Sequence, residues 1–180
     1  MELESLTQLL RGARDGDSSA GNRAYELIYE RLYRSARAQL ARKTSGTLTP
    51  TALVNEAWLK LSAADYEIND REHYLALASR AMRQIVVDVA RASLSDKRGG
   101  NAVKITLHEE LVDDSDVNVV RLEEAMQRLE ALDVRLSQVV QYRYFGGMGE
   151  EEIARILGVT DRTVRRDWRK ARAFLYNELR

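Results

Sequence analysis

The chain has 180 residues, no cysteine, one proline, and 28 basic residues against 28 acidic ones. This length allows one domain or two small ones, and the absence of cysteine excludes disulfides, thiolate metal sites and a thiol nucleophile. Because the net charge is zero, any surface that binds a polyanion must be local. No apolar run could cross a bilayer and the N-terminus has no signal-peptide core, so we expect a cytoplasmic protein with no membrane partner.

The first half of the chain has the apolar spacing of four helices, which we expect over about residues 2–14, 20–42, 50–62 and 71–92. Thr49 can cap the third helix and Pro50 suits its first position. The second helix should bury one face, made of Ala24, Leu27, Ile28, Leu32, Ala36 and Leu40. The fourth helix should bury Leu75, Ala78, Met82, Ile85, Val86 and Val89.

Residues 95–118 differ in composition from the helices on either side. They contain three basic and six acidic residues, a net charge of −3, with Gly99 and Gly100 and little apolar periodicity. We therefore expect a flexible acidic linker, with a short extended piece at Val103–Leu107. The predicted fold is all-α: a helical domain over 1–94, this linker over 95–118, and a second helical domain over 119–180.

The second domain should begin with helices at Val119–Leu132 and Val134–Phe145 and end in a helix-turn-helix. In the turn, Gly158 can adopt the left-handed conformation that ends a helix, and Thr160 can cap the next one. The last helix should bury a stripe of residues at helical spacing: Val164, Trp168, Ala171 and Leu175.

The last helix is also strongly basic. Residues 159–180 contain seven basic and three acidic residues, a net charge of +4 in a neutral chain. Most of its arginines fall off the buried stripe, where they can reach phosphates and base edges in a major groove. This pattern predicts a DNA-binding domain, although an amphipathic hairpin with solvated charges would show the same periodicity.

The order of motifs resembles that of bacterial RNA polymerase sigma factors of the extracytoplasmic-function (ECF) type, in the sigma-70 family, over nearly the whole chain. In the second domain the resemblance rests on Leu129, Leu132, Tyr144–Gly147, Glu152–Ala154, Leu157–Val159, Thr163–Val164 and Ala171–Arg172. In the first domain it rests on Leu53–Leu61 and the arginine-rich fourth helix. Finer features at 51–54, 82–88, 97–100 and 163–168 look like one subgroup of these factors.

The resemblance implies that the first domain is sigma domain 2, whose third helix docks on core RNA polymerase. The residues that match this docking surface are Leu53, Asn55, Glu56, Trp58 and Leu59. Leu53, Ala57 and Trp58 fit a core role as well. Asn55 and Glu56 are the better candidates for an interface, because a polar pair in the middle of a helix serves no core purpose.

The fourth helix and the loop before it read and open the −10 promoter element in this family. The corresponding residues are Tyr66, Arg80, Arg83, Gln84, Val87 and Arg91, which on the helix recur at three- and four-residue steps. Such a stripe suits phosphates and base edges. Tyr66, His73 and Tyr74 lie where a flipped base could stack, although packing is the favoured role for Tyr74.

By the same resemblance, the second domain is sigma domain 4, which reads the −35 element through its last helix. The expected contacts are Thr160, Arg162, Thr163, Arg165, Arg166 and Arg169. The acidic linker would thread toward the polymerase active-site channel, or it would serve as a solvated tether.

One departure from the family pattern suggests regulation. Family members usually have acidic residues where the docking helix begins, whereas this chain has Ala52 with Thr47, Thr49 and Thr51 nearby. We hypothesise that a Ser/Thr kinase phosphorylates Thr51 to supply the missing charge. Capping and turn formation explain the threonines equally well. Control by an anti-sigma protein is the other option.

Two other function classes compete with a sigma factor. A helix-turn-helix regulator that acts without polymerase would need a ligand pocket or a dimer interface, and it leaves the basic fourth helix unexplained. An enzyme is disfavoured, because the chain has only two histidines and no glycine-rich phosphate loop. We therefore expect no catalytic residues, no metal and no cofactor, with core polymerase and promoter DNA as partners.

Overall fold

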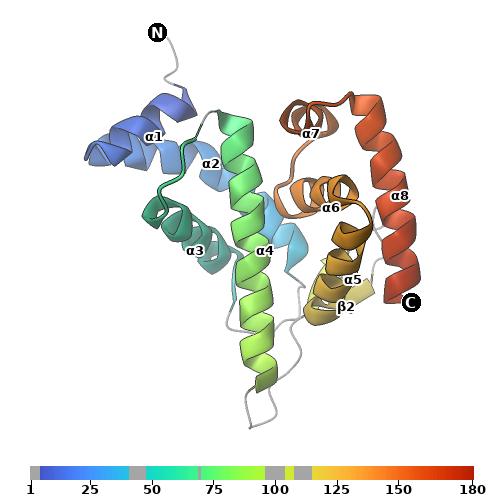
Figure 1. Cartoon of the computed structure of the whole chain (residues 1–180). Helices are drawn as coiled ribbons and strands as arrows, with labels where there is room; N and C mark the ends of the chain where they lie inside the picture. The colour runs from blue at the N-terminus through green and yellow to red at the C-terminus, as the bar shows by residue number, and fades with distance from the viewer. Residues whose placement is uncertain (1–4, 41–47, 69, 96–103, 108–114) are drawn as a thin grey trace.

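The computed structural model describes residues 5–40, 48–68, 70–95, 104–107 and 115–180. Apart from one short hairpin, the described fold is helical, as predicted (Figure 1). The first half contains α1 (Leu6–Arg14), α2 (Ser18–Gln39), α3 (Pro50–Ala63) and α4 (Arg71–Ser95). Two strands follow, β1 (Lys104–Leu107) and β2 (Ser115–Asn118). The second half contains α5 (Val119–Leu132), α6 (Val134–Val140), a π-helical turn η1 (Gln141–Phe145), α7 (Glu150–Leu157) and α8 (Asp161–Leu179).

Short polar residues start the helices of the first half. Ser5 and Gln8 form a reciprocal capping box on α1, and the Asp17 side chain caps α2. The Thr49 hydroxyl accepts from the Ala52 amide with Pro50 in the first turn of α3, as predicted. The Asp70 carboxylate accepts from the His73 amide at 2.7 Å, where α4 begins. These caps satisfy amides that have no partner inside a helix.

The core of the first half is built on α4, which lies in the middle of the molecule (Figure 1). The largest fully buried side chains here include Ile28, Leu32, Leu53, Tyr74 and Met82. The prediction that Leu27 is buried was wrong, since 52% of it is exposed. The buried residues of α2 step by four, and a neighbour of Ile28 points about 100° away around the helix.

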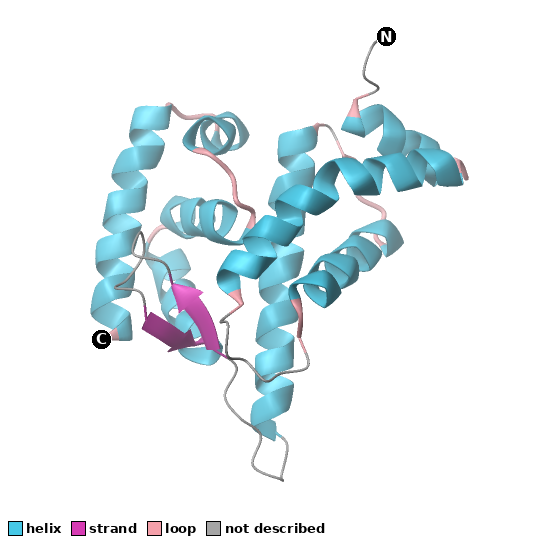
Figure 2. Cartoon of the chain, turned by 180° about the vertical axis from the view of Figure 1, so that it is seen from behind, coloured by secondary structure: helices cyan, strands magenta, loops and turns pink. Residues whose placement is uncertain are grey.

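The predicted linker contains a two-stranded antiparallel hairpin, with Lys104 opposite Asn118 and Leu107 opposite Ser115 (Figure 2). The extended piece expected at Val103–Leu107 is therefore confirmed for Lys104–Leu107. The other residues of the linker, 96–103 and 108–114, lie outside the described residues. α4 ends at Ser95, which is the first residue of the predicted linker.

The second half packs α5 and α6 against α8, with Met126, Leu129 and Leu175 fully buried between them. Asp167 is also buried, and its carboxylate accepts from Arg135 Nε of α6 at 2.6 Å. The helix expected over Val134–Phe145 changes to a π-helical turn at Gln141. This π-helical turn faces the first half of the chain.

The two halves share one continuous hydrophobic core, because α4 packs on η1, α5 and α7, and α2 packs on η1. Gly146 lies at this junction, where a Cβ atom would come within 2.7 Å of the Tyr142 carbonyl oxygen and 3.1 Å of the Ser79 Cβ. A larger residue would therefore push the halves apart. Within the described part of the chain, no helix has the length and apolar content that a membrane crossing requires.

Candidate nucleic-acid interface

α7 and α8 are joined by a short turn whose geometry follows from its sequence. Gly158 ends α7 with φ of 64°, a left-handed conformation that costs glycine little. The Thr160 hydroxyl then accepts from the Thr163 amide at 3.2 Å and starts α8. Ile153 and Val164 are fully buried where the two helices cross. The turn therefore holds α8 at a fixed angle to α7.

The outer face of α8 is basic and open to solvent. Arg162, Arg165, Arg166 and Arg169 are all exposed, as is Thr160 in the turn, while Thr163 is half-buried. Val164, Trp168, Ala171 and Leu175 are buried, as predicted. The predicted −35 contacts thus lie together along one edge of the molecule.

Some of these arginines are already held in place by neighbouring side chains. Arg165 donates to Asp161 at 2.7 Å and lies 3.4 Å from the Glu150 carboxylate. Arg166 lies 3.6 Å from the buried Asp167. Arg162 makes no ion pair or hydrogen bond with any described residue. Arg162 is therefore the most available donor on this face.

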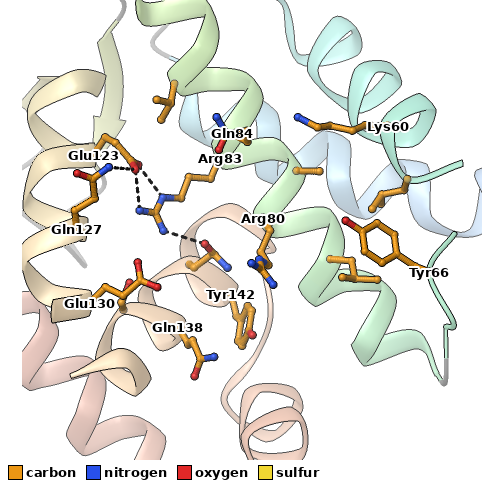
Figure 3. Close-up of a pocket in the computed structure, with 16 residues that line it drawn as sticks. Lys60, Tyr66, Arg80, Arg83, Gln84, Glu123, Gln127, Glu130, Gln138 and Tyr142 are labelled. Atoms are coloured by element: carbon orange, nitrogen blue, oxygen red, sulfur yellow. Dashed lines mark hydrogen bonds and ion pairs between the residues drawn. The ribbon is translucent and has the colours of Figure 1, made fainter. Parts of the chain in front are cut away.

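The predicted −10 stripe on α4 is split by contact with the second half. Arg80, Gln84 and Arg91 are exposed, whereas only 13% of the Arg83 side chain is exposed. Arg83 Nε lies 2.9 Å from the Glu123 carboxylate of α5, and its Nη1 donates to the Gln141 side chain at 3.0 Å. Figure 3 shows this guanidinium directed at the Glu123 carboxylate.

Val87 was expected among the −10 contacts, but it is buried in this structure. Only 4% of it is exposed, where α4 borders a cleft between the two halves. Its side chain therefore presents almost no surface to DNA in this arrangement.

A polar cleft of about 710 Å³ lies between α3 and α4 of the first half and α5, α6 and η1 of the second half. Lys60, Arg80 and Arg83 line it from the first half, together with Tyr66 (Figure 3). The second half contributes carboxylate, amide and phenol groups: Glu123, Gln127, Glu130, Gln138, Gln141 and Tyr142. Burial raises the pKa of the Tyr142 hydroxyl, an effect that nearby Arg80 opposes. The cleft thus brings basic side chains of one half against acidic and amide side chains of the other.

A second cavity, of about 120 Å³, lies under the loop between α3 and α4. Trp58, Tyr66 and Tyr74 line it with apolar residues of α1 and α3. Tyr66 is 44% exposed at its edge. The Tyr74 hydroxyl is buried and has no hydrogen-bond partner among the described residues, and burial raises its pKa. His73, the other aromatic candidate, is half-buried in the first turn of α4.

The predicted docking residues divide into a buried and an exposed group. Leu53 is fully buried, so it supports α3 and leaves no surface for a partner. Trp58 is half-buried, with its ring edge-on to Tyr25 at 5.2 Å. Asn55 and Glu56 are exposed, and Leu59 is 61% exposed.

The start of α3 carries no acidic residue in its first turn. Thr51 is exposed there, at the second helical position. The Thr49 hydroxyl is already used as the cap, since it accepts from the Ala52 amide at 3.1 Å. Thr47 lies outside the described residues.

Sequence reasoning missed the residues that join the two halves. Arg31 of α2 pairs with Glu152 of α7, and Arg155 Nη2 of α7 lies 2.8 Å from Glu72 of α4. These partners are 121 and 83 residues apart in sequence. Helical periodicity predicts only that such charges face outward. It contains no signal for which helix of the other half they meet.

A search of curated proteins finds no match to this chain. A family model described as "ECF sigma factor" matches residues 3–180. Its match spans both helical halves and the segment between them. The chain therefore belongs to the ECF sigma factor family.

Proposed function

We propose that this protein binds core RNA polymerase in the cytoplasm and directs it to promoters with −35 and −10 elements. Residues 1–94 would act as sigma domain 2, residues 95–118 as the linker and residues 119–180 as sigma domain 4. The observation that carries the proposal is the exposed arginine face of α8, presented by the fixed turn at Gly158. The family match over both halves supports the same role.

At the −35 element, α8 would lie in the major groove. The stretch from Arg162 to Arg169 has eight residues and covers about 10 Å of helix, which suits a groove about 12 Å wide. Thr160 and Thr163 lie at the N-terminal end of α8, whose amides favour a phosphate. Because Arg162 makes no ion pair or hydrogen bond with the described residues, its whole donor set is available for a base or a phosphate.

At the −10 element, Arg80, Arg83, Gln84 and Arg91 would contact the strand, with Val87 as a packing residue beneath them. The cavity under Tyr66 would receive one flipped base. Its volume of about 120 Å³ suits a single ring system, and Tyr74 forms part of its wall. Tyr66 at the cavity edge would stack on the base.

Docking on polymerase would use Asn55, Glu56 and Leu59 of α3, which are exposed. Leu53 and Trp58 would contribute indirectly, because they pack α3 against the core. Leu59→Arg should abolish co-purification with core polymerase, because it places a charge in an apolar contact. Leu27→Arg is the matched control, since Leu27 is a similarly exposed leucine on another helix. Equal recovery of polymerase with both variants would contradict this docking surface.

We also propose that phosphorylation of Thr51 strengthens polymerase binding. A phosphate there would add a charge of about −1.5 to −2 in a helix turn that has no acidic residue, near amides that favour anions. Thr51→Glu should bind polymerase more tightly than Thr51→Ala in a pull-down. Strong and equal binding by both variants and by unmodified protein would contradict control by a Ser/Thr kinase and leave an anti-sigma protein as the regulator.

A further inference from the structure

The contact between the two halves contains buried polar groups that bond across it, although the Gln39 Oε1 atom has no partner among the described residues. The Gln39 amide of α2 donates to the carbonyl oxygens of Tyr144 and Phe145, both at 3.2 Å. The Ser35 hydroxyl lies 2.9 Å from the same Phe145 carbonyl oxygen. Gln39 is fully buried and Ser35 nearly so. Buried amides and carbonyls are costly to leave unpaired, so this contact favours one specific docking of the halves.

Ion pairs lie around this buried contact. Arg31 binds the Glu152 carboxylate through both terminal nitrogens, and it also donates to the Gly147 carbonyl oxygen at 3.1 Å. Arg155 binds Glu72 at the outer edge. The Glu152 carboxylate also accepts from the Gly149 amide at 2.8 Å, so the contact is tied to the start of α7. Charge-assisted and two-pronged bonds of this kind fix orientation as well as contact.

The same docking withdraws Arg83 from the surface. Its guanidinium donates twice to the Glu123 carboxylate, at 2.9 and 3.2 Å, and once to Gln141. A carboxylate bound to a guanidinium in this way occupies the N–H donors that would otherwise bind a DNA phosphate. Arg83 cannot serve a promoter strand while Glu123 holds it.

The other two functional faces stay open in this arrangement. The arginines of α8 are exposed, and so are Asn55, Glu56 and Leu59 of α3. Polymerase could therefore engage α3 before the halves separate. Between α4 and α5 the only covalent connection is the segment 96–118.

We propose that the free protein is self-inhibited, with Glu123 of α5 occupying Arg83 as a stand-in for a −10 phosphate. Release of α5 from α4 exposes Arg83 to DNA. The inference rests on the proposed role of α4 in DNA binding, and it adds a closed state that must open first. An equilibrium of this kind lowers the apparent DNA affinity by the fraction of molecules that are open.

Three variants test the closed state. Glu123→Gln weakens the ion pair to Arg83, and Gln39→Leu removes two of the buried hydrogen bonds between the halves without changing any charge. Glu124→Gln is the matched control, because it makes the same charge change at an exposed neighbour on α5. The chain has no cysteine, so spin labels can be placed at Ala63→Cys on α3 and Ala131→Cys on α5, both exposed.

Two measurements are made on the free full-length protein. Electron–electron distances between the labels report opening, and fluorescence anisotropy reports binding of a labelled random-sequence single-stranded DNA. We expect longer, broader distances and about three- to tenfold tighter DNA binding for Glu123→Gln and Gln39→Leu, with Glu124→Gln matching the wild type. Adding Arg83→Ala to Glu123→Gln should remove the gain.

Unchanged distances and affinities in both opening variants would overturn the inference, as would an equal gain from Glu124→Gln. Polymerase-directed transcription is measured separately with the same proteins. Its absence from the wild type would contradict the proposed function, whereas the distances and affinities of the free protein decide on the closed state. The two failures therefore remain distinguishable.

Discussion

Arg31 of α2 and Glu152 of α7 form a two-pronged ion pair across the junction of the two halves, with Nη1 2.7 Å from Oε1. Both side chains are about one-fifth exposed, so solvent screens the pair only partly. Glu152 also caps α7 through the Gly149 amide. One carboxylate therefore couples the start of α7 to α2.

This pair predicts an acid-sensitive junction. The Arg31 side chain holds the pKa of Glu152 below its ordinary value of 4.5, against the effect of burial, with further help from the Gly149 amide and the charge of Arg71. A lowered carboxyl pKa contributes stability that is complete above pH 4.5 and is lost as the pH falls through the folded-state pKa.

We therefore expect the stability difference between wild type and Glu152→Gln to be largest near neutral pH and to shrink below about pH 4.5. Urea unfolding at a series of pH values measures this difference. A difference that is constant down to about pH 3 would contradict the assignment.

Replacing Arg135 and replacing Asp167 should lower the free energy of unfolding by different amounts. Asp167 is 1% exposed, whereas the Arg135 side chain is 40% exposed. Arg135→Met removes the closer of two arginine partners of a buried carboxylate and leaves Arg166 at 3.6 Å, at a cost of about 3 kcal/mol. Asp167→Asn leaves an arginine that water can reach, at about 1–2 kcal/mol. Urea unfolding of the two variants compares the costs, and the reverse order would contradict this account of the pair.

Gly158→Ala should destabilise the turn between α7 and α8 by about 1 kcal/mol, because alanine is disfavoured at φ of 64°. Space is not the cause, since a Cβ at this position would meet nothing within 4 Å. Gly21→Ala is the control, within α2 and in ordinary contact with Ala13 at 3.4 Å. We expect it to stabilise the protein by roughly 0.5–1 kcal/mol. Equal effects in thermal unfolding would exclude a conformational cause.

Arg162→Ala should weaken binding to −35 duplex DNA by about 1–2 kcal/mol, or roughly five- to thirtyfold. The closed arrangement leaves this face open, so the free protein can be titrated with DNA. Arg180→Ala removes the same charge at the far end of α8, where Arg180 lies over the Tyr176 ring. We expect the control to stay within about twofold of the wild type. Equal losses in both variants would indicate a general effect of charge.

Local patterns were enough to predict most of the fold. The predicted bounds of α5, the cap at Thr49 and the left-handed Gly158 agree with the structure, because each depends on residues within one or two helical turns. The exposed arginines of α8 and the exposed Leu59 follow from the same periodicity.

Contacts between the halves were not predictable in this way. The π-helical turn η1 lies where Gln39 of α2 donates hydrogen bonds to its carbonyl oxygens, and helical spacing in the sequence does not predict that partner. The ion pair between Arg83 and Glu123 has the same origin. A stripe of α4 that looks like a free DNA-binding face in sequence is therefore partly covered in the folded chain.

The most direct test of the proposed function is transcription in vitro with core polymerase and a library of −35/−10 promoter sequences. The protein should direct initiation at a subset of promoters that share both elements, and the combined change Arg162→Ala with Arg83→Ala should abolish it. Arg180→Ala should leave the promoter set unchanged. Initiation that is equally strong without the protein, or operator binding by a dimer with no requirement for polymerase, would contradict the assignment.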